Sequence, residues 1–177
     1  MKRIAKLAGL LLISVAFFPA SAQESQKLSD AEVASVAVVA NQIDISYADI
    51  AKEKSRNAEI LKFAETMAND HRAVIGQASA LVKKLGVTPK DNPVSKKLLA
   101  DAENTKKQLK ATSKATFDKA YIDNEVAYHK AVISAVEDLL IPETENSELK
   151  ALLSNVLPAL KTHLAHAEMV QKGLSHK

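Results

Sequence analysis

The chain has 177 residues, of which 24 are Lys or Arg and 21 are Asp or Glu, and it contains neither cysteine nor tryptophan. Without cysteine the protein cannot use disulfides, thiol chemistry or thiolate metal ligands. It has four glycines, and neither a glycine-rich phosphate loop nor the Gly-x-Ser-x-Gly turn of serine hydrolases occurs in it. Because aromatic side chains are few, a stacking platform for nucleic acids is not expected.

The first 22 residues have the three parts of a secretory signal peptide. A start with three basic residues is followed by twelve apolar residues, 7–18, and by a small-x-small cleavage site at 20–22. Twelve residues of helix rise only about 18 Å, which is too short for a hydrocarbon core of roughly 30 Å. We therefore expect a signal peptide at 1–22, cleaved before Gln23, and no transmembrane segment in the processed chain.

Cleavage changes the charge balance of the protein. The predicted signal peptide holds three of the 24 basic residues and no acid, which leaves 21 bases against 21 acids in residues 23–177. A domain without net charge gives no global argument for a nucleic-acid partner. The expected product is a single domain at 23–177, located in the bacterial periplasm or secreted.

Apolar residues recur every three or four positions in four long segments, a spacing typical of amphipathic helices. Ser29 and Glu32 have the spacing of a capping box that opens the first helix after a short leader, and Gly86 follows the second helix as a typical terminator. Pro158 lies inside the last pattern and predicts a kink there. The predicted helices cover 29–53, 58–85, 94–110, 116–141 and 147–172.

The helix at 94–110 is lysine-rich and has a weaker apolar stripe than the others. Four long helices joined by a short, a long and a short connection predict an all-α fold. We expect a ferritin-like four-helix bundle, with a long crossover carrying the extra helix between the second and third long helices. An up-down-up-down bundle with a decorated connection is the alternative.

Three histidines lie on the apolar faces of three different predicted helices. His71, His129 and His163 are each near the middle of a helix, and Asp44 has the same position in the first helix. In a bundle of helices of similar length, mid-helix positions reach one level. We therefore predict a metal site formed by Asp44, His71, His129 and His163, with Asp70 and Glu125 as further ligands or as residues that orient the ligands.

Imidazole and carboxylate ligands suit zinc, copper or iron better than calcium or magnesium. Metal binding needs neutral imidazoles, so affinity should fall below about pH 6. The alternative is a structural polar layer, because buried histidines are commonly neutral residues that are hydrogen-bonded within the core. His166 and His176 lie off the apolar faces and are expected in solvent.

The region from Lys83 to Lys119 contains ten lysines and four acids. Such a surface could bind an anionic partner of the cell envelope, such as a membrane surface or a cell-wall polymer. The alternative is a solvated face of a peripheral helix.

With these segments in view, the chain resembles a secreted bacterial family known as domain of unknown function 4142. The similarity extends over almost all of residues 23–177. It is carried by Ala40-Asn41-Gln42-Ile43-Asp44, Met67-Ala68-Asn69-Asp70-His71, Phe117-Asp118-Lys119-Ala120-Tyr121, His129 and Leu157-Pro158-Ala159-Leu160-Lys161-Thr162-His163.

Members of this family are often labelled outer membrane proteins and are assigned a ferritin-like fold, so the resemblance implies that fold and an exported location. It implies no established reaction. Ferritin-type di-iron centres use Glu-x-x-His on two helices, whereas the residues three positions before the histidines here are Ala68, Val126 and Leu160. A di-iron centre of that type is therefore not expected.

Two functions fit these observations. One is a periplasmic metal- or ligand-binding bundle that acts through the histidine layer as a sensor, scavenger or buffer. The other is a structural or interaction protein of the envelope in which the histidine layer is purely structural. Whether the protein is an enzyme stays open, although the absence of a nucleophile–base pattern favours a binding protein. Its oligomeric state is also undetermined by the sequence.

Overall fold

The computed structural model describes residues 27–175. The predicted signal peptide, its cleavage site and His176 therefore lie outside the described residues. Within residues 27–175 the chain is 88% helical and contains no strand, which confirms the predicted all-α class.

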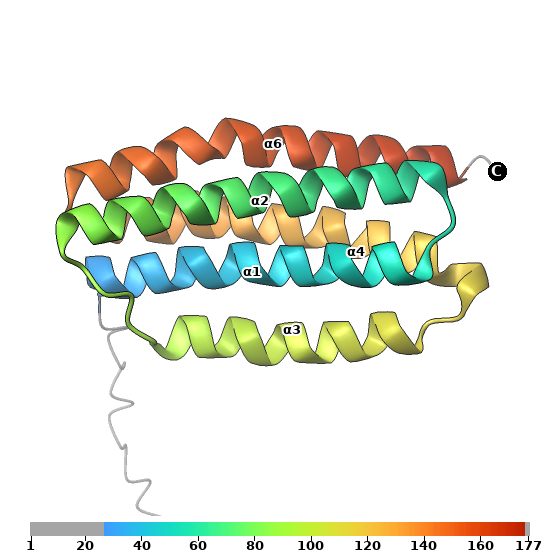
Figure 1. Cartoon of the computed structure of the whole chain (residues 1–177), viewed down its shortest axis with the longest axis horizontal. Helices are drawn as coiled ribbons and strands as arrows, with labels where there is room; N and C mark the ends of the chain where they lie inside the picture. The colour runs from blue at the N-terminus through green and yellow to red at the C-terminus, as the bar shows by residue number, and fades with distance from the viewer. Residues whose placement is uncertain (1–26, 176–177) are drawn as a thin grey trace, which may run out of the picture.

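Five substantial helices follow one another along the chain (Figure 1). A five-residue π-helical turn, η1, and one short helical turn, α5, continue the fourth of them. The elements are α1 (Asp30–Lys54), α2 (Ala58–Leu85), α3 (Pro93–Ala111), α4 (Lys114–Ala135), η1 (Val136–Leu140), α5 (Ile141–Glu143) and α6 (Ser147–Ser175).

Four long helices form the bundle, and α3 packs outside it against α1 (Figure 1). Helix α1 runs antiparallel to α2, and α4 runs antiparallel to α6; these two pairs have the most extensive contacts in the bundle. Helix α3 carries the chain from the end of α2 back to the opposite end of the molecule, where α4 begins. The predicted extra helix in the crossover is therefore present, while kinship with ferritins stays a prediction.

Local signals in the sequence set several helix ends. The backbone N–H of Ser29 donates to the carboxylate of Glu32 at 3.0 Å, which forms part of the predicted capping box. Helix α2 ends at Gly86, whose φ of 66° is in the left-handed region that favours glycine.

The end of α4 differs from the prediction. A helix was expected to stop before Pro142, but the chain stays helical to Glu143 through the π-helical turn. In that turn the backbone N–H of Ile141 donates to the carbonyl of Val136, five residues earlier. Pro142 lies in the first turn after this change of register, where proline is tolerated.

Two other features refine the expectations from the sequence. Leu28, expected in a flexible leader, is buried in the core, and its backbone N–H donates to the Glu143 carboxylate at 2.7 Å. Helix α6 stays continuous through Pro158 and bends near its middle (Figure 1).

The apolar core consists of two clusters, one toward each end of the bundle. One contains Phe63, Phe117 and Tyr121, and the other contains Leu140 and Leu153. Along α6, the buried residues before His163 belong to the second cluster and those after it belong to the first. The histidine level is therefore where the two apolar clusters meet. Across residues 27–175, no helix is long and apolar enough to cross a membrane.

The two-cluster core predicts a large cost for truncating a side chain at its centre. Ile60 is fully buried in the first cluster, so Ile60→Ala should lower the free energy of unfolding by about 2–5 kcal/mol. Leu99 is 42% exposed on α3, and Leu99→Ala, the matched control, should change it by less than about 0.5 kcal/mol. Chemical denaturation measures both, and equal losses in the two variants would contradict this core.

Candidate metal centre

Four long helices each place one polar side chain at the same level of the bundle. Asp44 comes from α1, His71 from α2, His129 from α4 and His163 from α6, and all four are buried. Their common level follows from their position, because each lies 13 to 16 residues, or about 20–24 Å, from the start of its helix. The predicted meeting of these residues in one layer is confirmed.

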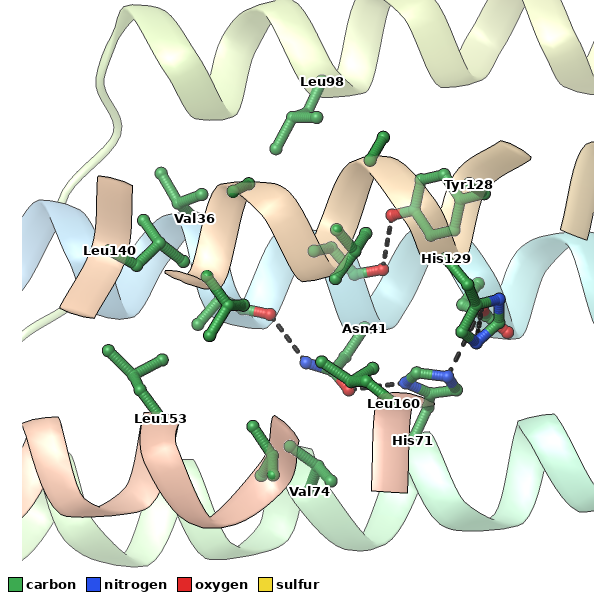
Figure 2. A pocket seen from close by; sticks show the side chains of 18 of the residues that line it. Val36, Asn41, His71, Val74, Leu98, Tyr128, His129, Leu140, Leu153 and Leu160 are labelled. Atoms are coloured by element: carbon green, nitrogen blue, oxygen red, sulfur yellow. Dashed lines mark hydrogen bonds and ion pairs between the residues drawn. The ribbon is translucent and has the colours of Figure 1, made fainter. Parts of the chain in front are cut away.

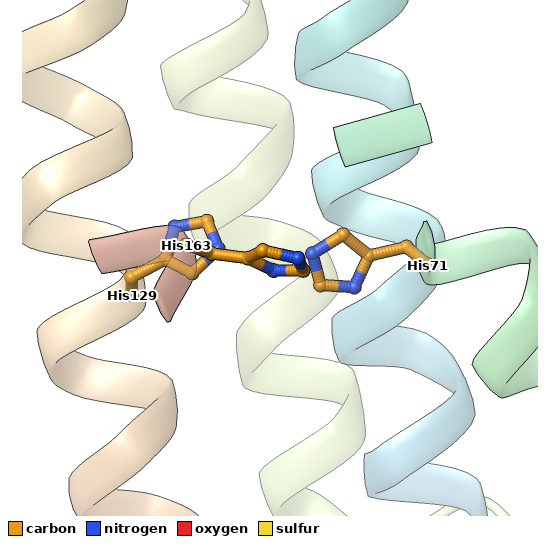
Figure 3. Close-up of side chains that lie close together, drawn as sticks. All are labelled: His71, His129 and His163. Carbon is orange, nitrogen blue, oxygen red and sulfur yellow. The ribbon is translucent and has the colours of Figure 1, made fainter. Parts of the chain in front are cut away.

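The three imidazole rings lie at one level of the bundle (Figure 3). Their centroids are 5.8 Å apart for His71 and His129, 5.3 Å for His71 and His163, and 5.6 Å for His129 and His163. One nitrogen from each ring lies within 4.8 Å of the other two. The rings are thus close enough to share one small ion.

A hydrogen bond fixes the orientation and the tautomer of His71. Its Nδ1 lies 2.7 Å from the side-chain oxygen of Asn41 (Figure 2). The amide nitrogen of Asn41 donates to the carbonyl of Ala37 at 2.8 Å, which requires the amide oxygen to face the histidine. An amide oxygen can only accept, so Nδ1 of His71 carries the proton and its Nε2 keeps a lone pair.

The other two histidines follow the same rule with different acceptors. Nδ1 of His129 lies 3.0 Å from the backbone carbonyl of Glu125, and Nε2 of His163 lies 2.9 Å from the carboxylate of Asp70. Each of these nitrogens therefore donates. In neutral rings the remaining nitrogens, Nε2 of His129 and Nδ1 of His163, keep lone pairs.

The remaining nitrogen of each ring is buried without a hydrogen-bond partner among residues 27–175. This is true of Nε2 of His71, Nε2 of His129 and Nδ1 of His163. Buried polar atoms are nearly always hydrogen-bonded, and leaving one unpaired costs about 1–3 kcal/mol. Three such atoms at one level are candidate ligands for one metal ion.

Asp44 provides a carboxylate beside two of these nitrogens. Its Oδ2 lies 3.4 Å from Nε2 of His71 and 3.6 Å from Nε2 of His129, beyond ordinary hydrogen-bond length. Both carboxylate oxygens are buried without a hydrogen-bond partner in the described part of the chain. Burial raises the pKa of Asp44 from 3.8 to about 7.

Burial has the opposite effect on the imidazoles, because their protonated form is the charged one. It lowers the pKa of His71 to about 3, with a smaller contribution from the neighbouring His129 and His163. It lowers the pKa of His129 to about 4, against a smaller opposing effect of the hydrogen bond to the Glu125 carbonyl. Both rings are therefore neutral near pH 7, as metal ligands must be.

A second carboxylate lies at the edge of the layer. Glu125 is fully buried, and its Oε2 is 3.6 Å from Nδ1 of His129. Burial first, and the charge of the nearby Asp44 second, raise the pKa of Glu125 well above its usual value. Asp44, Glu125 and His129 also bring one ligand atom each within 4.8 Å of one another.

Most, but not all, of the polar residues around the layer were found from the sequence. Asp70 and Glu125 lie beside the histidines that they were expected to orient. Asn41 was missed, although its place one turn before Asp44 on the same helix is the signal that could have revealed it. His166 is half-buried rather than solvated, because its ring packs edge-on against Phe63 with centroids 5.0 Å apart.

Half of the lysines in the region between Lys83 and Lys119, five of ten, are paired with acidic side chains. Lys90, for example, pairs with Glu32 of α1. These pairs reduce the positive charge that an anionic partner would meet, so the binding face that we considered stays a prediction.

The fold and the layer together define an all-helical protein with a buried cluster of histidine and aspartate side chains. A family model described as domain of unknown function DUF4142 matches residues 17–170, and the chain belongs to that family. Neither a curated protein nor a solved structure matches the chain. What the cluster does must therefore be argued from its own geometry.

The raised pKa of Asp44 predicts how metal-free stability depends on pH. The folded state binds the proton of Asp44 more tightly than the unfolded state does. The contribution of this proton to the free energy of unfolding is therefore complete below pH 3.8 and is lost as pH rises through 7. An asparagine side chain at this position would mimic the neutral acid without titrating. Relative to wild type, Asp44→Asn should gain stability as pH rises from about 4 to 7, by at most about 4 kcal/mol.

Denaturation with a chelator present, at several pH values between 5 and 8, measures this difference. The histidines are the same in both proteins, so their titration cancels. Asp49→Asn, on the partly exposed side of the same helix, is the matched control for replacing an acid by an amide. A pH-independent difference for Asp44→Asn would show that this carboxyl is already ionised in the fold.

Proposed function

We propose that the protein binds one late first-row transition-metal ion in the histidine layer. The ligands are Nε2 of His71, Nε2 of His129, Nδ1 of His163 and the carboxylate of Asp44. The observation that carries this proposal is the set of three inward-facing lone pairs. Each is held in place by a hydrogen bond from the opposite nitrogen of its own ring, the arrangement that metal-binding histidines usually have.

The spacing of the three nitrogens suits such an ion. An ion at the centre of nitrogens that lie within 4.8 Å of one another is at most about 2.8 Å from each, against roughly 2.0–2.1 Å in zinc sites. Each ring therefore has to move inward by less than about 1 Å.

The donor set indicates which metals the site would bind. Three imidazoles and one carboxylate suit zinc, copper(II) or iron(II), whereas calcium and magnesium prefer sites made wholly of oxygen atoms. A four-ligand set is typical of tetrahedral zinc. Ala68, Val126 and Leu160 occupy the positions where ferritin-type di-iron centres have glutamate, so we propose a single ion rather than such a pair.

The signal peptide predicted at 1–22 would place this site in the periplasm or outside the cell. There a buried metal site of this kind would serve as a sensor, a scavenger or a buffer. The proposal assigns binding to the layer and leaves the physiological partner of the metal-loaded protein undefined.

Zinc should raise the melting temperature of the wild-type protein, because an ion that binds only the folded state stabilises it. Replacement of one inward-facing ligand in His129→Ala should abolish that rise. His166→Ala is the matched control, since its ring is half-buried and lies outside the layer. Thermal melts with and without zinc and a chelator, together with elemental analysis of untagged protein, measure the effect.

The alternative of a purely structural layer makes the opposite prediction. In that case neither zinc, copper(II) nor iron(II) changes the melting temperature of the wild type. His129→Ala would then lower stability equally with and without the chelator. That result would refute metal binding at this site.

Metal affinity should depend on pH through Asp44 rather than through the imidazoles. Below its pKa of about 7 this carboxyl must release a proton before it can bind an ion. Between about pH 7 and 5, the zinc affinity should fall about tenfold for each pH unit. This replaces the onset near pH 6 expected from an ordinary imidazole, because burial keeps His71 and His129 neutral down to about pH 4.

Calorimetric titrations with zinc at several pH values measure this slope. Asp44→Asn should bind zinc more weakly at pH 7.5 and show little change down to pH 5. A wild-type profile that is flat to pH 6 and then falls with two or more protons would assign the dependence to the imidazoles instead.

A further inference from the structure

A cavity of about 360 Å³ opens directly from the histidine layer into one half of the bundle (Figure 2). Its polar end is formed by His71, His129 and His163, and its other end is lined by Val36, Leu140 and Leu153. The two ends differ sharply in chemistry. A molecule that fills this cavity therefore needs one polar end and an apolar remainder.

The volume sets the size of that molecule. An apolar protein cavity of about 150 Å³ accommodates benzene with its six carbons, or about 25 Å³ for each non-hydrogen atom. By that measure 360 Å³ holds about 14 such atoms, and such volumes lie within the usual range of ligand pockets.

The length of the cavity indicates the shape of the molecule. On α6 the lining extends from Leu149 to His163, 14 residues that rise about 21 Å along the helix. About 14 atoms spread over that length form a single unbranched chain rather than a set of fused rings. The π-helical turn η1 lies at the apolar end, and such turns are frequent at functional sites.

The charge of the histidine layer with a metal ion bound indicates which polar group the molecule in the cavity should carry. A divalent ion with the Asp44 carboxylate as its one charged ligand leaves a net charge of +1 on the ion and its direct ligands, in a buried place where an unpaired charge is unfavourable. Zinc that keeps an open position beside three protein ligands can expand to five ligands, so an added oxygen can bind where the fourth protein ligand is only loosely held. An anionic oxygen at the end of the chain meets both requirements.

An N–H donor of Asn124 that is unpaired in the described part of the chain indicates that the polar end of the molecule carries a hydrogen-bond acceptor. Asn124 is one of the residues that line the cavity, and its side-chain nitrogen is buried without a hydrogen-bond partner among the residues described. As an N–H donor it needs an oxygen to accept from it. A carboxylate has more acceptor capacity than an alcohol of the same length.

We propose that the cavity binds one unbranched aliphatic carboxylate of about twelve carbons. Its chain fills the apolar part and its carboxylate binds the metal ion at the histidine layer. The inference rests on the proposed metal function and names the ligand of that same site. Ala127 and Ala131 of α4 line the cavity and are exposed at the surface, which gives the chain a route inward.

Dodecanoate, which has 14 non-hydrogen atoms, is the probe. Calorimetry should show that one molecule binds the zinc-loaded wild-type protein. Binding to the metal-free protein should be at least tenfold weaker, and binding of dodecanol to the zinc-loaded protein should be weaker by a similar factor. Glu125 is the one other buried acid beside the layer among the described residues. If Glu125 were ionised and balanced the charge of the ion, dodecanol would bind as tightly as dodecanoate.

Val132 is half-buried on α4 and lines the cavity without contributing a ligand. Val132→Trp should weaken dodecanoate binding at least tenfold while leaving the zinc-induced rise in melting temperature in place. Leu99→Trp, on the exposed side of α3, is the matched control and should bind dodecanoate as the wild type does. The zinc melt also reports whether each variant is folded.

The outcomes separate this inference from the metal proposal. If zinc raises the melting temperature but dodecanoate does not bind, the inference is overturned and the metal proposal stands. Equal affinities for dodecanoate and dodecanol, or for the zinc-loaded and metal-free proteins, overturn the placement of the carboxylate on the metal. If zinc has no effect on the melt, both proposals fail, and the melt alone shows it.

Discussion

The structure depends on how three imidazoles are held in the middle of an apolar bundle. Each ring donates from one nitrogen to an acceptor at the rim of the layer: the Asn41 amide, the Glu125 backbone carbonyl or the Asp70 carboxylate. These bonds set which nitrogen of each neutral ring carries the proton, and they leave the other three nitrogens buried at one level without a partner among the described residues. Apolar packing cannot satisfy them, and no described neighbour donates to them. Every other feature of the layer follows from that constraint.

The layer also divides the hydrophobic core. Aromatic residues such as Phe63 and Tyr121 pack densely on one side, while the other side holds aliphatic residues and the cavity. Desolvation favours the uncharged form of both kinds of group, because it raises the pKa of Asp44 and lowers the pKa of His71 and His129. A cation at this point would relieve the unpaired lone pairs and allow the carboxylate to ionise.

The cavity and the layer are adjacent because of the small side chains on α1 and α4. Alanines such as Ala37, Ala40 and Ala131 line the cavity where larger residues would fill it. The hydroxyl of Tyr128 donates to the carbonyl of Ala40 at 2.8 Å and links the two helices beside the open space. A polar cluster and an apolar cavity side by side form a site for an amphiphile, whereas either feature alone would be ambiguous.

The sequence by itself determined the helices and the level of the histidines. Apolar periodicity located all five substantial helices, and the equal depth of Asp44 and the three histidines within helices of similar length brought them to one layer. Only the tertiary structure decided which nitrogen of His71 and of His163 donates, because their acceptors, Asn41 and Asp70, belong to other helices. It also decided the cavity, since an unfilled volume depends on how far apart neighbouring helices pack and not on the pattern of any one of them. The candidate ligand residues can thus be identified from the sequence. The direction of their lone pairs and the volume of the cavity depend on how the helices pack against one another.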